Sequence, residues 1–166
     1  MQTTSPIDTG KAEGRRTLRF SSIDDVLADA QQLAETERAG KVRRLGNWTV
    51  GQNLNHLATW VKFSFEGAPM RVPWIIRLPM KVLARKTFIE GPMRAGSKIP
   101  RVPNGTFGAE PIELEEALGK FNAEFGRLKA GPPALPHMIF GPLTHEDWIK
   151  AHLRHAELHL SFLRAD

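Results

Sequence analysis

The sequence predicts an all-α fold, a bundle of four helices with one long connection. Four segments carry apolar residues at helical spacing, and no segment alternates apolar and polar residues strongly enough to indicate a strand. The chain has 166 residues, of which 41% are hydrophobic, so it can bury one core. We therefore expect a single helical domain over residues 15–166. A flexible, polar lead-in is expected over residues 1–14.

The first two helices have recognisable start signals. The first is expected to begin after Ser22, a residue type that caps helices, and to end near Ala39. In the second, Thr49 and Gln52 have the spacing of a capping box, in which each side chain bonds the other's backbone N–H. Gly67 is a suitable end for this helix.

The last two helices follow the long connection. The third is expected to start near Pro111, which suits a first-turn position, and to end at Gly131. The fourth is expected to be capped by Thr144, with Asp147 three residues on, and to run close to the C-terminus.

The connection over residues 68–101 carries a larger net positive charge than the whole chain. It has eight basic residues and one acidic residue, Glu90, which gives +7 against +5 for the whole chain. Its core, residues 74–88, can form a shorter helix interrupted at Pro79. We expect no specific nucleic-acid binding, because the charge lies in a Pro-rich loop rather than on a helix face. The basic residues are Arg71, Arg77, Lys81, Arg85, Lys86, Arg94, Lys98 and Arg101.

The composition excludes several kinds of site. There is no cysteine, so the chain has neither disulfides nor thiolate ligands, and any metal site must use histidine, carboxylate or backbone oxygen. No apolar stretch is long enough to span a membrane, and the polar N-terminus lacks the apolar stretch of a secretory signal. We expect a cytoplasmic protein.

Histidines gather on one stripe of the fourth helix. The stripe is bounded by aromatic residues, so we expect it to line a half-buried groove. It consists of Trp148, His152, His155, His159 and Phe162. On the second helix, His56 lies one turn before Trp60, on a face other than the main apolar stripe. His56 should therefore point between helices.

This pattern favours a metal site. His155 and His159, four residues apart, present two ring nitrogens on one side of a helix, and His56 from a facing helix supplies a third. Three nitrogens leave a coordination position open on a divalent ion, as in catalytic sites, and water there becomes a nucleophile. His152 should not be a ligand. Because it lies one turn before His155, it is the candidate general base.

A purely structural interpretation stays open. A buried histidine is usually a packed side chain with satisfied hydrogen bonds, and pairs of histidines four residues apart also occur by chance. We expect His137 and His145 to be structural or surface residues. Trp48, Trp60 and Trp148 are expected to belong to the core.

Two segments resemble the signatures of the DinB/YfiT-like superfamily. The first is residues 47–58, with Trp48, a hydroxyl residue and then His56-Leu-Ala; the second is residues 148–160, with the pair His155 and His159. Residues 15–20 and 137–144 resemble an uncharacterised branch known only as a domain of unknown function. The similarity extends over most of the chain.

The resemblance implies a four-helix bundle of up-down-down-up type. Members of the superfamily are regarded as metalloenzymes, often dimeric, which hold nickel or zinc with three histidines. Carried over to this chain, those are His56, His155 and His159. An apolar stretch, residues 74–80, adds to the expectation of a homodimer, because a small bundle does not readily bury it alone.

Two classes of function follow. The first is a metal-dependent hydrolase or transferase that acts on an unidentified small substrate, anionic if the basic connection guides it. The second is a non-catalytic interaction protein whose basic connection docks on nucleic acid or another anionic surface. The histidine stripe favours the first, since it has no role in the second. Imidazole suits several transition metals; the resemblance favours zinc or nickel.

Overall fold

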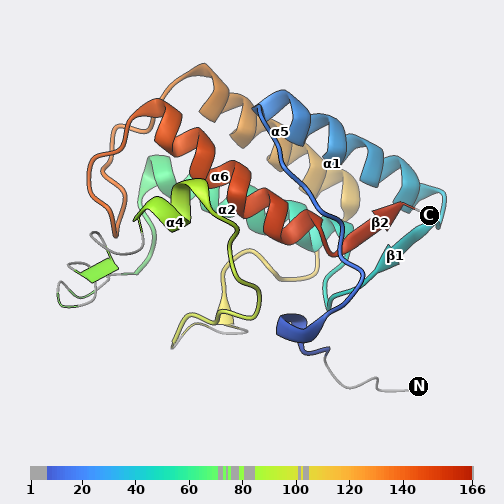
Figure 1. The fold of residues 1–166 in the computed structure, drawn as a ribbon. Helices are drawn as coiled ribbons and strands as arrows, with labels where there is room; N and C mark the ends of the chain where they lie inside the picture. The colour runs from blue at the N-terminus through green and yellow to red at the C-terminus, as the bar shows by residue number, and fades with distance from the viewer. Residues whose placement is uncertain are drawn as a thin grey trace.

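The computed structural model describes residues 7–70, 73, 75, 79–80, 85–100, 102 and 105–165, except for the side chain of Thr87. Within these residues the chain forms five α-helices, a short 3-10 helix and two short strands (Figure 1). The helices are α1 (Ile23–Arg38), α2 (Val50–Glu66), α4 (Arg85–Glu90), α5 (Leu114–Ala130) and α6 (His145–Leu160). The other elements are η1 (Thr9–Lys11), β1 (Val42–Arg44) and β2 (Leu163–Ala165).

The helix starts follow the capping signals of the sequence. Ser22 caps α1 in a complete capping box with Asp25, and Thr49 caps α2 in another with Gln52. At α6 the Thr144 hydroxyl accepts a hydrogen bond from the Asp147 N–H at 3.1 Å. These three caps were predicted. Satisfying the free N–H groups of a first turn stabilises a helix by about 1 kcal/mol.

The core lies among α1, α2, α5 and α6, which contact one another in the interior. Each of these helices buries apolar side chains along its length. The largest fully buried side chains include Phe121 and Phe125 of α5, whose rings stack with centroids 4.3 Å apart. The short helix α4 packs on α6 (Figure 1). Helices α2 and α6 also contact each other directly.

The prediction of an all-α, up-down-down-up four-helix bundle is wrong. Strands β1 and β2 form an antiparallel pair, in which Arg43 lies opposite Arg164, and α4 is a further helix. Each strand has only three residues, too few to show an alternating pattern. The last residues were predicted as helix because Phe162 and Leu163 continue its apolar spacing; α6 instead ends at Leu160 and the chain returns beside β1.

The segment before α1 lies extended along α6. The Phe20 N–H donates to Glu157 Oε1 at 2.6 Å, and Arg154 donates to the Phe20 carbonyl oxygen at 2.7 Å. Near the N-terminus, Ile7 and Asn47 exchange two hydrogen bonds. The division into a lead-in over residues 1–14 and a domain over 15–166 stays a prediction.

Much of the basic connection lies outside the described residues. This applies to Arg71, Arg77, Lys81 and Arg101, and to most of the apolar stretch over residues 74–80. Helix α4 overlaps the end of the short helix predicted over residues 74–88. The third long helix starts at Leu114, later than the predicted Pro111. Among the helices that the structure describes, none is long and apolar enough to cross a membrane.

Candidate metal centre

His56 occupies the second turn of α2 and is buried, with 2% of its surface exposed. Its Nδ1 lies 2.7 Å from the carbonyl oxygen of Phe107. A carbonyl only accepts, so Nδ1 carries the proton and donates it. The other ring nitrogen, Nε2, therefore keeps its lone pair free for a metal ion.

A backbone segment over residues 107–109, which we call the strap, binds α2 beside His56. Its three consecutive carbonyl oxygens accept hydrogen bonds from α2 side chains: Phe107 from His56, Gly108 from Asn55 at 2.9 Å, and Ala109 from Gln52 at 2.7 Å. Asn55 is buried, with 4% exposed. The strap holds the His56 ring in one tautomer and one orientation.

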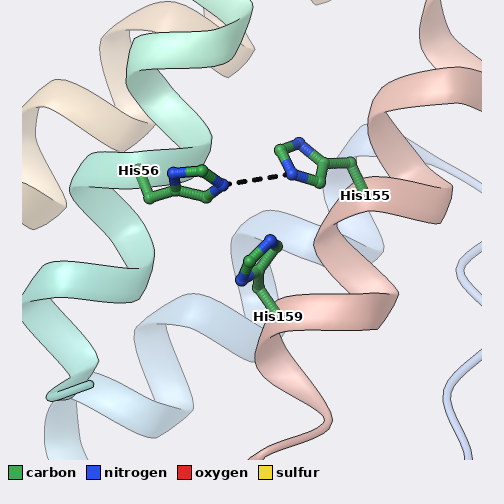
Figure 2. A group of neighbouring side chains, drawn as sticks. All are labelled: His56, His155 and His159. Atoms are coloured by element: carbon green, nitrogen blue, oxygen red, sulfur yellow. Dashed lines mark hydrogen bonds between the residues drawn. The ribbon is translucent and has the colours of Figure 1, made fainter. Parts of the chain in front are cut away.

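His155 and His159 lie on successive turns of α6 and face His56 across the interface with α2 (Figure 2). The Nε2 atoms of His56 and His155 are 3.2 Å apart. One ring nitrogen from each of the three histidines can be chosen so that all lie within 4.8 Å of one another. The structure thus brings together the three histidines that the sequence singled out.

Burial keeps the three imidazoles neutral. Burial of the His56 ring lowers its pKa to about 4. The pKa of His155 is lowered well below its usual value by burial and then by the nearby His159 and His56. For His159, burial lowers the pKa, helped by His56 and by the positive charge of Arg15. At neutral pH each ring then offers a lone pair, the form that binds metal.

Aromatic rings form the wall around the three histidines. Trp48 stacks face to face on His159, with centroids 5.3 Å apart and planes 4° from parallel. Trp60 lies edge-on to both His56 and His155, at 6.2 Å from each. Phe63 and Phe107 pack on Trp60 in turn. We expected Trp48 and Trp60 in the core; both are only partly buried and both contact the histidines.

The geometry suits a transition-metal ion. Nitrogen ligands at 2.0–2.1 Å in tetrahedral arrangement lie roughly 3.3 Å from one another. The separation of 3.2 Å between the Nε2 atoms of His56 and His155 matches this value. The full set of three nitrogens lies within the wider limit of 4.8 Å. Without an ion, His155 can donate its Nε2 proton to His56, so the pair is also satisfied by a hydrogen bond.

His152 does not join the three-histidine group. Its ring is buried, stacks on Trp148 at 6.0 Å and places Nε2 2.9 Å from Ser64 Oγ. Burial lowers its pKa to about 3, with a smaller contribution from His137. The ring is therefore neutral and packed between α2 and α6.

The remaining histidines have structural contacts. His137 Nδ1 accepts the backbone N–H groups of Ile139 and Phe140 at 3.1 and 3.2 Å, which fixes the loop before α6. His145 Nε2 donates to the carbonyl oxygen of Leu128 at 2.6 Å, near the end of α5. A bond of this kind satisfies a carbonyl that the helix itself leaves free.

Sequence reasoning missed the strap and Ser64. The strap lies some fifty residues from α2 in the chain, and its contribution comes from backbone carbonyls, which no residue type reveals. The available signal was the pair of amides Gln52 and Asn55 close to His56 on α2, because an amide that is buried or half-buried needs a hydrogen-bond partner.

No curated protein and no solved structure matches the chain. One family does, over residues 12–166, and its description is "Protein of unknown function (DUF1569)". This confirms the predicted link to an uncharacterised domain family. Because the match covers nearly the whole chain, the protein belongs to the DUF1569 family.

Proposed function

We propose that this protein is a metal-dependent enzyme that binds one divalent transition-metal ion through His56, His155 and His159 and acts on a small molecule. One observation carries the proposal: three neutral ring nitrogens, from two helices fixed side by side, lie within 4.8 Å of one another in a partly exposed aromatic setting. Histidines that only pack in a core are not expected to bring a nitrogen from each of three rings so close together.

The chain's own residues would prepare the site in three ways. The strap fixes the His56 tautomer, burial keeps all three rings unprotonated, and the aromatic wall limits the access of water. A bound divalent ion would supply Lewis-acid activation of water or of a substrate oxygen. This chemistry fits a hydrolase or a transferase.

Zinc and nickel are the metals we propose. Neutral imidazole donors suit both, and the described residues contribute no thiolate and no carboxylate to the group. We also propose that the DUF1569 family is part of the DinB-like superfamily, on the strength of the two signatures around His56 and His155. The resemblance adds the proposal of a homodimer, which light scattering at micromolar concentration tests directly.

For His152 we propose a role in proton transfer, relayed through Ser64. The contact of 2.9 Å between Nε2 and the hydroxyl links α6 to α2 one turn from His155. A pKa of about 3 makes the ring alone a weak proton acceptor at neutral pH, so a direct general-base role is less suited to it.

Elemental analysis of protein purified without a histidine tag tests the proposal. We expect close to one transition-metal ion per chain, or uptake of one ion when zinc or nickel is added to chelator-treated protein. A chain that contains no such metal and binds none on addition would contradict it. The interaction-protein alternative would then be the better account.

A further inference from the structure

The indole N–H of Trp60 is a buried hydrogen-bond donor that has no acceptor among the residues described here. Tryptophan donates but cannot accept, and a buried indole N–H usually finds a partner. Leaving such a group without one is destabilising. A phenylalanine ring would fill much of the same space without that cost. The donor therefore calls for a functional explanation.

Trp60 lies beside the two nitrogens that approach most closely. Its ring is 6.2 Å from His56 and 6.2 Å from His155, the pair joined by the dashed line in Figure 2. Phe63 and Phe107 flank it at 5.8 and 6.4 Å. The unpartnered N–H thus belongs to an otherwise apolar wall next to the candidate metal position.

Other donors nearby are already engaged. Thr59 donates to the carbonyl oxygen of Asn55 at 2.8 Å, and Ser64 donates to that of Trp60 at 3.1 Å. Asn55 itself donates to Gly108. Beside the three histidines, among the residues that the structure describes, the Trp60 N–H is a buried donor without a partner, available to a molecule that enters the site.

We propose that Trp60 Nε1 donates a hydrogen bond to an oxygen atom of the ligand that occupies the open coordination position. The inference rests on the proposed function and extends it to a substrate class: small carbonyl or carboxylate compounds with an apolar body. The oxygen would contact the metal ion and the indole, and the body would lie against Phe63 and Phe107.

Benzoate binding to the cobalt(II)-loaded protein tests this. Cobalt gives visible absorption bands that report on its ligands, and benzoate supplies both the oxygen and the apolar ring. We expect benzoate to shift the bands of the wild type, and Trp60→Phe to weaken benzoate about tenfold, the loss expected for one hydrogen bond to a charged group. Cobalt affinity should not change.

Two controls separate a lost hydrogen bond from general damage. Imidazole, which offers no acceptor once bound through nitrogen, should bind wild type and Trp60→Phe equally. Trp148→Phe makes the same chemical change in an indole that contacts His137 and His152 instead of the three-histidine group, and should leave benzoate affinity within about twofold.

Each contrary outcome has a distinct meaning. Equal benzoate affinity in wild type and Trp60→Phe would overturn the inference while the metal site stands, as would a wild type whose cobalt bands do not respond to benzoate. A wild type that binds no cobalt would remove the proposed function and the inference with it. If Trp60→Phe does not fold, NMR of the zinc-loaded wild type decides: benzoate should move the Trp60 indole N–H resonance downfield, and no movement would contradict the proposal.

Discussion

Individual histidines of this chain have different partners, and these partners define their roles. His56 is fixed by a carbonyl, His155 faces it at 3.2 Å, and His152, one turn before His155, is bonded to Ser64 further along α2. Sequence spacing placed His152 and His155 on one stripe. In the structure both rings contact α2, but they meet different residues of it: His155 meets His56, and His152 meets Ser64.

We predict that removing His155 and removing His152 will have different effects on metal binding. His155→Ala should weaken zinc at least about 100-fold, more than the loss of an outer-shell partner usually costs. His152→Ala should keep zinc affinity within about threefold, because its ring is not in the group. Competition with a chromophoric chelator measures both. A metal-free His152→Ala beside a fully loaded His155→Ala would show that the wrong histidines were assigned.

At the scale of elements, the strap depends on Gly108. Its φ is +75°, and a Cβ at this position would lie 2.6 Å from Thr59 Oγ1 and 3.0 Å from the Cα of His56. Only glycine allows the strap to approach α2 this closely, so the hydrogen bond to His56 depends on a residue 52 positions away in the chain.

Gly108→Ala should therefore displace the strap and weaken zinc binding by roughly 10–100-fold, the range for the loss of an outer-shell contact. The matched control is Gly119→Ala on α5, where a Cβ meets nothing within 4 Å. That change should stabilise the protein by about 0.5–1 kcal/mol, since alanine is the better helix former. Zinc titration and thermal unfolding distinguish the two. Unchanged zinc affinity in Gly108→Ala would mean that the strap does not position His56.

The sequence predicted the starts of three helices but missed the two strands. The caps of α1, α2 and α6 were predicted because Ser22, Thr49 and Thr144 act on neighbours within one turn. The pair β1 and β2 was missed because its partners are about 120 residues apart, a distance over which local patterns carry no information. The three histidines were predicted because their residue type marks them as possible ligands, although His56 and His155 are 99 residues apart in the chain. The strap was not predicted, because it acts through backbone carbonyls, which no residue type reveals.

At the scale of the whole molecule, burial of neutral histidines makes stability depend on pH. The pKa is about 4 for His56 and His137 and about 3 for His152, against 6.5 in an unfolded chain. At a pH between the lowered pKa values and 6.5, the histidines of the unfolded chain bind protons that those of the folded chain do not. The free energy of unfolding must then fall as the pH is lowered from about 6.5 towards 4.

We predict that the metal-free protein loses stability steeply in this range. His137 alone should contribute a loss of about 2 kcal/mol between pH 7 and pH 5, on the scale of 1.36 kcal/mol for each pKa unit. Urea unfolding at the two pH values measures the total, and His137→Gln should reduce the difference. A metal-free protein equally stable at pH 7 and pH 5 would contradict the neutral state of these rings.

The central claim is that His56, His155 and His159 hold one ion together, and X-ray absorption of the zinc-loaded protein tests it most directly. The account predicts three imidazole nitrogens at about 2.0–2.1 Å in the wild type and two in His56→Ala, because α2 supplies one of the three ligands. An identical coordination sphere in wild type and His56→Ala, or a zinc ion without imidazole ligands, would contradict it.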